Sequence, residues 1–168
     1  LLIFLIPVLK QNLFSRKDAL GMALLGIAMF SGFPYFMALG LEYTTAAHGG
    51  LIFATMPLMT LVIAVAVGVE QFTGLKVIAV ALGITGAAIA LGEQLGAIAP
   101  DALLGDFYFL LGVVGTSTFN VFSKRYIAKY GSLAVLAYTM AVGSFLLFIL
   151  ALILEHPFSG SLNFDAHG

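Results

Sequence analysis

Long apolar segments alternate with short polar connectors along this chain. The clearest apolar segment, residues 46–69, carries no charged side chain. At a rise of 1.5 Å per residue, a helix of this length is long enough to cross a hydrocarbon core of about 30 Å. A transmembrane β-barrel would instead show polar and apolar residues in alternation over about ten positions, which uninterrupted apolar runs such as 61–69 do not. The pattern therefore predicts membrane-spanning helices and an all-α fold.

The spacing of these segments predicts five complete membrane helices. They cover residues 19–40, 46–69, 75–92, 107–123 and 132–154. The fold class expected is a polytopic transmembrane helix bundle.

Two further segments do not form complete helices. Residues 1–9 are apolar but too short to span a bilayer, and we interpret them as the end of a severed helix. The polar interval 93–106, which contains Pro100, is the expected seam between two halves. Because the chain begins without Met inside an apolar run, we expect it to be a fragment of a longer protein.

Two prolines lie inside predicted helices. Pro57 has no backbone N–H to donate to the carbonyl of Phe53, and its ring crowds the preceding turn, so a kink is expected there. Pro34 is expected to bend the helix over residues 19–40 in the same way. In lipid, exposed backbone is tolerated only against protein or a water-filled cavity. Pro34 and Pro57 are therefore predicted helix breaks that widen a cavity.

The composition fits a membrane protein and excludes several other classes. Hydrophobic residues make up 61% of the chain and charged residues 9%, whereas soluble domains carry about 25% charged residues. The chain has no cysteine, which excludes a disulfide framework and thiolate chemistry. A net charge of -1 without a basic cluster gives no argument for nucleic acid. We therefore expect a lipid bilayer around the chain and no nucleic-acid partner.

Basic and acidic residues are expected at opposite membrane faces. If successive connectors alternate in side, one face receives all seven basic residues, namely Lys10, Arg16, Lys17, Lys76, Lys124, Arg125 and Lys129. Most acidic residues fall on the other face, among them Glu42, Glu93 and Asp106. Short cytoplasmic loops retain Lys and Arg, so the basic face is predicted to be cytoplasmic. The predicted location is the inner or plasma membrane, with several crossings.

Several predicted helices carry a thin stripe of neutral polar residues. Gly112, Thr116, Asn120 and Lys124 recur at four-residue intervals and are expected to share one helix face. An Asn inside a membrane helix is costly unless it is paired or wetted. Such stripes are explained either by hydrogen bonds between helices or by a shared central cavity. In the cavity interpretation, the lining residues are Ser31, Tyr35, Thr55, Thr116 and Asn120.

His48 is the histidine nearest a predicted helix, at one end of the segment 46–69. It is either an interfacial imidazole that faces water or a candidate gate at the mouth of a cavity. No two histidines have metal-ligand spacing, and no acid, base or nucleophile stands out inside the predicted helices. We therefore expect no metal site, no cofactor and no enzymatic activity.

The predicted helix over residues 75–92 has a face of small residues. Ala79, Gly83 and Ala87 recur at four-residue intervals, which lets another helix backbone approach closely. We interpret this face as a helix-packing surface, and a second copy of the chain in a homodimer is one partner that it allows.

Two parts of the chain resemble the EamA-type repeat of the drug/metabolite transporter superfamily. The first repeat is similar to GLEYTTAAHGGLIFATMPL followed by VEQFTGLKVIAVALGITGAAIALG, with Tyr43, Pro57 and Glu70 at the family's spacing. The opening of the second repeat is similar to GDFYFLLGVVGTSTFNVFSKRYIAKYGSLAVLAYTM. The chain departs from the family pattern at Val69, where Gly is usual, and at His48, where small apolar residues are commoner.

The resemblance implies a ten-helix carrier built from two inverted five-helix repeats. Residues 1–98 would supply the end of helix 2 and helices 3 to 5, and residues 99–168 would supply helices 6 and 7. Such a carrier moves a small-molecule substrate by alternating access. The substrate expected is an amino acid or a related neutral or zwitterionic metabolite, and export is one direction considered.

Two other classes of function stay open from the sequence. A non-transporting membrane subunit or scaffold is favoured if the polar stripes hydrogen-bond one another. A membrane-embedded enzyme is favoured if helices outside this chain carry the reactive groups.

Overall fold

The computed structural model describes residues 14–71, 73–91 and 102–154 of the chain. Its elements, in chain order, are α2 (Arg16–Gly26), η1 (Ile27–Gly32), α3 (Phe33–Tyr43), α4 (Ala46–Ala54), α5 (Met56–Ala66), α6 (Gly74–Leu91), α7 (Ala102–Tyr130) and α8 (Ser132–Leu154). No strand occurs among these residues, which confirms the all-α prediction. The predicted stump at 1–9 and most of the predicted seam at 93–106 lie outside the described residues.

Four helical segments are long and apolar enough to cross a membrane. They are Arg16–Tyr43, Ala46–Ala66, Ala102–Tyr130 and Ser132–Ile153. α6 adds an apolar helix of 18 residues. The prediction of a membrane helix bundle is confirmed by these segments.

α7 is longer than the helix predicted over residues 107–123. It continues through the basic cluster that was expected to end it. Lysine does not stop a helix here, because its long side chain carries the ammonium group to a polar partner. Lys129 Nζ, for example, lies 2.6 Å from Asp18 Oδ2. The helix ends before Gly131, whose φ of 83° is a left-handed conformation that glycine adopts without strain.

The segment predicted as a single kinked helix consists of two helices. α4 and α5 meet at Thr55, whose ψ of -7° lies outside the usual helical range. Pro57 lies in the first turn of α5, where a backbone N–H would have no partner within the helix, so proline costs no helical hydrogen bond there. α5 then ends at Ala66 rather than Val69, before a turn in which Gly68 has a φ of 72°.

The helix around Pro34 continues, in contrast to the helix around Pro57. Pro34 lies in the first turn of α3, directly after the π-helical segment η1. A π-helical turn absorbs an extra residue within a helix, so the chain can pass a proline without ending the span. α2, η1 and α3 accordingly form one span of 28 residues.

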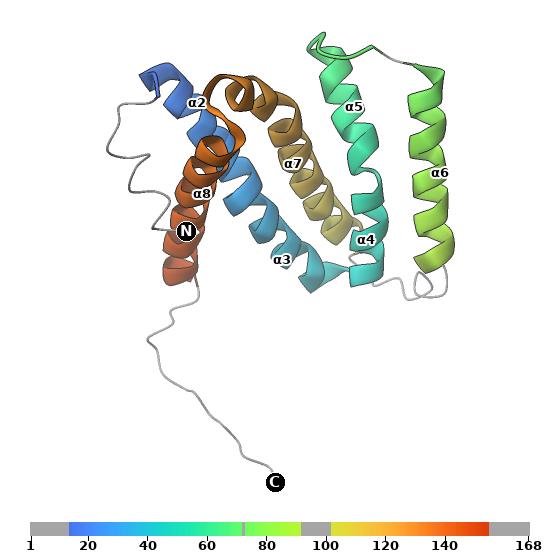
Figure 1. Cartoon of the computed structure of the whole chain (residues 1–168). Helices are drawn as coiled ribbons and strands as arrows, with labels where there is room; N and C mark the ends of the chain where they lie inside the picture. Colours follow the sequence, from blue (N-terminus) through green and yellow to red (C-terminus); the bar gives the residue numbers. More distant parts are fainter. Residues whose placement is uncertain (1–13, 72, 92–101, 155–168) are drawn as a thin grey trace, which may run out of the picture.

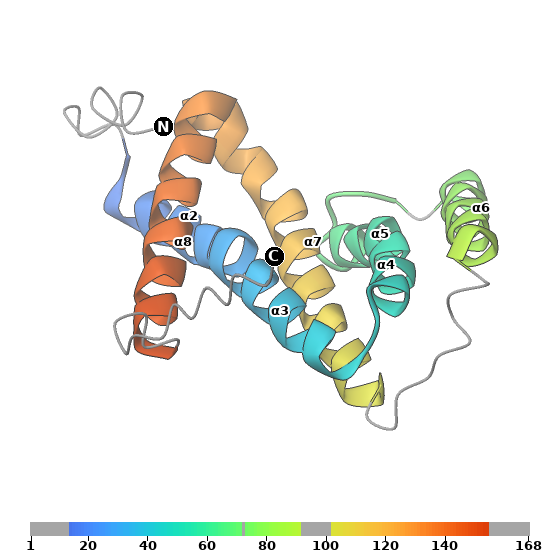
Figure 2. The same cartoon turned by 90° about the horizontal axis from the view of Figure 1, so that it is seen from below.

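α7 lies at the centre of the bundle. It packs against α3 and η1 on one side and against α4 and α5 on the other, while α8 folds back along α2 and η1. Figure 2 shows α6 and α8 at opposite edges of the arrangement. Figure 1 shows that α2 begins, and α5 and α7 end, at one end of the bundle, whereas the α3–α4 turn lies at the other.

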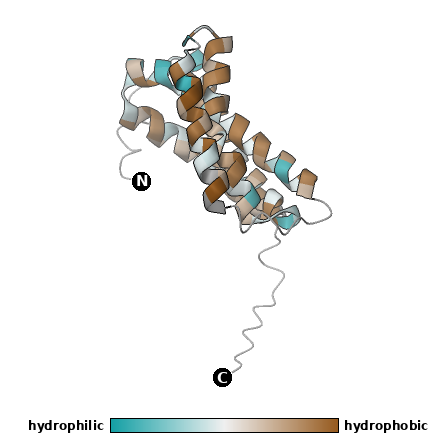
Figure 3. Ribbon diagram, turned by 90° about the vertical axis from the view of Figure 1, so that its right-hand side faces the viewer, coloured by the Kyte–Doolittle hydropathy of each residue, from teal (hydrophilic) through white to brown (hydrophobic). Residues whose placement is uncertain are grey.

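Charge distinguishes these two ends. The basic end, as we call it, carries Arg16, Lys17, Lys76, Lys124, Arg125 and Lys129. The opposite end, which we call the acidic end, carries Glu42, His48 and Asp106. Figure 3 shows hydrophobic residues along the middle of the helices and hydrophilic ones mainly toward their ends. Many large apolar side chains are exposed between the two ends, as expected for helices that face lipid.

Glycines allow the closest contacts in the bundle. Gly143 of α8 lies so near Gly26 that a side-chain carbon at position 143 would overlap the Gly26 carbonyl oxygen. Gly40 of α3 and Gly49 of α4 both lie against the ring of Phe109. Phe109 is 1% exposed, so this one ring fills the space where α3, α4 and α7 meet.

Candidate functional site

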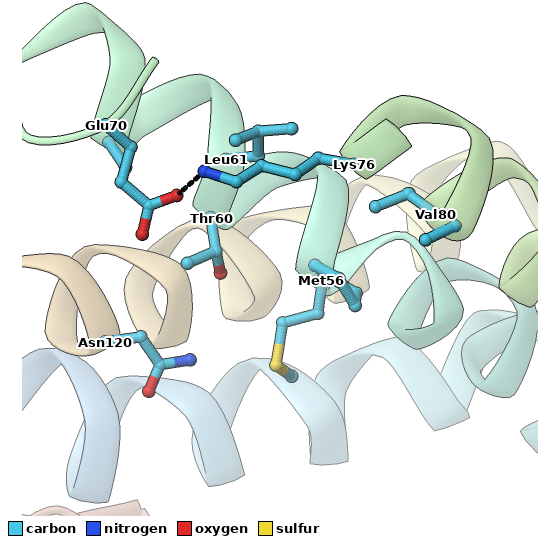
Figure 4. Close-up of a pocket in the computed structure, with 10 residues that line it drawn as sticks. Met56, Thr60, Leu61, Glu70, Lys76, Val80 and Asn120 are labelled. Atoms are coloured by element: carbon cyan, nitrogen blue, oxygen red, sulfur yellow. Dashed lines mark hydrogen bonds and ion pairs between the residues drawn. The ribbon is translucent and has the colours of Figure 1, made fainter. Parts of the chain in front are cut away.

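A pocket of 470 Å³ lies between α5, α6 and α7, and we call it the α5–α7 pocket. Its walls are mainly apolar side chains of α5 and α6, and its polar side chains are Thr60, Glu70, Lys76 and Asn120 (Figure 4). Pro57 also lines it, so the helix break forms part of its wall. Thr60 was not among the predicted lining residues. Its position one turn after Pro57, a predicted helix break, is a sequence signal that could have indicated it.

The backbone at the break around Thr55 is paired by hydrogen bonds, although Met56 and Pro57 beside it line the pocket. The Thr55 hydroxyl donates to the carbonyl oxygen of Ile52 at 2.6 Å. The Ser117 hydroxyl of α7 lies 3.4 Å from the carbonyl oxygen of Met56 and donates to it. Polar backbone next to the break is therefore paired by one local and one long-range hydroxyl, as an apolar environment requires. Ser117 was not among the predicted residues.

The polar stripe on α7 turns around the helix and faces different neighbours. Four residues advance by about 40° more than one helical turn, so members of a four-residue repeat drift across the surface. Gly112 packs against Phe33, whereas Asn120 is exposed and lines the α5–α7 pocket. Thr116 lies between them, 3% exposed, and its hydroxyl has no hydrogen-bond partner among the described residues.

A second pocket, of 550 Å³, lies between α3 and α8, on the other side of α3 from α4. Pro34, Tyr35 and Glu42 line it together with apolar residues of α8. The five predicted lining residues are therefore not gathered in one cavity. Asn120 lies in the first pocket and Tyr35 in the second, while Ser31, Thr55 and Thr116 line neither. Ser31 is 2% exposed within η1.

An ion-pair cluster borders the α5–α7 pocket at the basic end. Lys76 Nζ lies 2.8 Å from Glu70 Oε2, and Lys124 Nζ lies 3.4 Å from Glu70 Oε1. The hydrogen bond from Lys76, its positive charge and the hydrogen bond from Lys124 lower the pKa of the Glu70 carboxyl below its usual range. Lys124, predicted to lie on the cytoplasmic face, thus joins α7 to the turn between α5 and α6.

Removing the Glu70 charge is expected to reduce stability near neutral pH and to have a smaller effect in acid. A carboxyl whose pKa is lowered by folding stabilises the folded state above its unfolded pKa, and this contribution is lost as pH falls through the folded pKa. Thermal unfolding of the full-length protein should therefore show a small deficit for Glu70→Gln at pH 6 that is smaller at about pH 3, below the usual carboxyl pKa. Molar salt should shrink the deficit at pH 6, because the pair is exposed. An equal deficit at both pH values contradicts the assignment.

His48 lies in the first turn of α4 and lines neither pocket. The side chain of Thr45 caps the helix by accepting a hydrogen bond from the His48 backbone N–H. His48 Nδ1 lies 3.6 Å from Asp106 Oδ1 of α7. The imidazole therefore lies between two helices, beside Asp106, which was not predicted to be near it.

The model of the EamA-like transporter family matches residues 1–92, more than half of the chain. The chain belongs to this family. It is also similar to the uncharacterized transporter YyaM of Bacillus subtilis (strain 168), with 28% identity over 163 residues. That alignment covers 95% of this chain and 52% of the relative, so the chain spans about half the length of the curated relative that it matches. No solved structure matches the chain.

Family membership agrees with the geometry of the described helices. The EamA-like family is one of transporters, and four segments of this chain are long and apolar enough to span a membrane. The family match also confirms the resemblance drawn from Tyr43, Pro57 and Glu70 in the sequence. The chain is thus part of a multi-pass membrane protein of a transporter family.

Proposed function

We propose that the protein to which this chain belongs carries a small neutral or zwitterionic metabolite, such as an amino acid, across the cell membrane by alternating access. In this proposal residues 1–98 belong to the first five-helix repeat and residues 99–168 to an inverted second one, and the basic end faces the cytoplasm. Two findings support the proposal: residues 1–92 match a transporter family, and the similar bacterial protein is named as a transporter.

The observation that carries the proposal is the position of Asn120. Its side chain lines the α5–α7 pocket from α7, and Thr60 lines the same pocket from α5, beside the helix break (Figure 4). An amide offers both donors and an acceptor, and a hydroxyl offers one of each, so together they suit a solute with paired donor and acceptor groups. Apart from Thr60, Asn120 and the ion pair at its border, the pocket is lined by apolar residues, which favours a solute without net charge.

The charged contacts of α7 support alternating access. Lys124 joins α7 to Glu70 at the basic end, and Asp106 approaches His48 of α4 at the acidic end. Both partners lie in the proposed first repeat, whereas α7 lies in the second. Opening one end of the carrier therefore requires one of these contacts to separate while the other holds, which is the behaviour expected of repeats that rock around a central site.

Replacing Asn120 by Leu is expected to slow transport about tenfold. Leucine has a similar size but pairs with no polar group of the solute, and leaving one such group unpaired costs about 1–3 kcal/mol. The measurement is uptake of a radiolabelled amino-acid panel into proteoliposomes that contain the full-length protein. Detergent extraction and thermal unfolding of Asn120→Leu establish that it folds.

Thr118→Val is the matched control on the same helix. The Thr118 hydroxyl donates to Val114 of its own helix and does not line the pocket, so this variant should transport at the wild-type rate. Unchanged transport in Asn120→Leu would remove the α5–α7 pocket from the solute path. Failure of the wild-type protein to move any member of the panel would reject the proposed solute class.

A further inference from the structure

His48 and Asp106 form a contact at the acidic end whose polar atoms are incompletely paired. The side chains are 17% and 32% exposed, and Nδ1 and Oδ1 lie 3.6 Å apart. His48 Nε2 and Asp106 Oδ1 are both buried without a hydrogen-bond partner among the described residues. Buried polar atoms in folded proteins are almost always paired, so two unpaired atoms in one contact require an explanation.

Helix packing sets the distance between these two groups. Thr45 caps α4 through the backbone N–H of His48, which fixes the start of the helix. The next residue, Gly49, lies directly against the ring of Phe109. Phe109 lies one turn after Asp106 on α7, so the contact that brings α4 to α7 also brings the imidazole to the carboxylate. The distance of 3.6 Å is too long for a good hydrogen bond but short enough for strong attraction between opposite charges.

The other ionisable groups at this end do not provide a competing positive charge. The elements packed on α4 bring Glu42 and Tyr43 from α3 and Asp106 and Tyr108 from α7. α5 has no ionisable side chain, and the only one on α6 is Lys76, at the basic end. Among the described residues, the acidic end is therefore negative when His48 is neutral. A proton on the imidazole would supply the positive charge that this end lacks.

We propose that His48 and Asp106 together bind one proton and that this proton closes the acidic end by joining α4 to α7. The proton adds to the free ring nitrogen, after which both nitrogens are donors and the ring is positive. Nδ1–H then donates to Asp106 Oδ1, giving a charge-assisted hydrogen bond of about 2.8 Å.

In this proposal, loss of the proton weakens the contact between α4 and α7. The neutral imidazole leaves Asp106 Oδ1, the buried oxygen of the carboxylate, without a counter-charge, which favours separation of α4 and α7 and entry of water. The proton-binding site needs no assumption about transport. Only its role as the gate of a carrier rests on the proposed function, because there the separation of α4 from α7 opens one side of the solute path.

The test measures the distance between α4 and α7 as a function of pH, without any solute. Ala46 and Leu103 are exposed positions at the acidic ends of these helices, and this chain has no cysteine. Spin labels are attached to Ala46→Cys and Leu103→Cys in the full-length protein, which is first freed of other cysteines and placed in nanodiscs. Double electron–electron resonance then measures the distance between the two labels. A long-distance population at pH 8.0 is expected to fall at least about fivefold at pH 5.5.

Variants of the pair separate the proton site from other causes of a pH response. His48→Gln and Asp106→Asn should give the same distance distribution at both pH values, and Glu42→Gln, a carboxyl at the same end, should respond as the wild type does. His48→Lys, which is charged at both pH values, should keep the short distance at pH 8.0. If gel filtration and thermal unfolding show that His48→Gln does not fold, His48→Lys still tests the role of the positive charge.

Each outcome decides the proposal. A wild-type distance that does not change with pH overturns it, as does a full response in His48→Gln or its loss in Glu42→Gln. The result is independent of solute, so a failed transport assay with an intact distance response rejects the proposed function and leaves the proton site standing. Transport with no distance response rejects the proton site and leaves the proposed function standing.

Discussion

Gly143→Val is expected to separate α8 from the first helical span and to cost the folded protein about 3 kcal/mol. A Cβ at position 143 would overlap the carbonyl oxygen of Gly26 and the side chain of Phe30. Because backbone atoms of two helices are in contact there, no rotamer change relieves the overlap and the helices themselves must move. In full-length protein in detergent, the expected result is a large drop in the thermal unfolding midpoint and in the yield of monodisperse protein.

Gly83→Ala in α6 is the matched control for that substitution. No atom lies within 4 Å of a Cβ built at Gly83. Alanine is a better helix former than glycine by about 1 kcal/mol, so stability should be unchanged or slightly raised. Equal losses in Gly143→Val and Gly83→Ala would mean that the helix packing around Gly26 is not as described, or that a partner covers α6 in the whole protein.

Phe109→Ala is expected to cost about 3 kcal/mol, the lower end of the range for large-to-small changes in a core. The ring lies against Gly40 and Gly49, and its centroid is 5.4 Å from that of Phe53. In a membrane, lipid is as apolar as the protein interior, so the cost comes from lost packing contacts and the cavity rather than from exposure to water.

Leu110→Ala provides the comparison for Phe109→Ala. Leu110 is the next residue on α7 and is 39% exposed, so its removal leaves no closed cavity. Thermal unfolding of the two full-length variants should therefore differ clearly, with Leu110→Ala close to wild type. A similar loss in both would show that the junction of α3, α4 and α7 does not depend on the ring.

The helices were largely predictable from the sequence because membrane spans are set by length and hydrophobicity, which are local properties. The exact ends of the helices were less predictable. Lys124 was expected to end a helix, but partners on other elements, such as Glu70, let α7 continue through the basic cluster. The segment 46–69 gave no sign that the chain stops at Thr55 and resumes, since Pro57 is compatible with either a kink or a new helix.

The candidate site was predictable only in part. Asn120 was identified because an amide inside a membrane helix is unusual, and this argument needs no knowledge of its neighbours. The partners of polar groups depend on how helices pack, which sequence spacing does not reveal. Ser117 pairs with a carbonyl 61 residues away. Similarly, nothing in the local sequence connects His48 with Asp106.

The gathering of most contacts on α7 has a consequence for biosynthesis. α2, η1, α3, α4 and α5 all pack against α7, which follows α5 in the chain. Ribosomes add about 5–20 residues per second, so several seconds pass between the completion of α5 and that of α7. During this interval the early helices are already in the membrane without the element that holds them together. A pause or cleavage between α6 and α7 would therefore strand an unassembled set of helices for membrane quality control to remove.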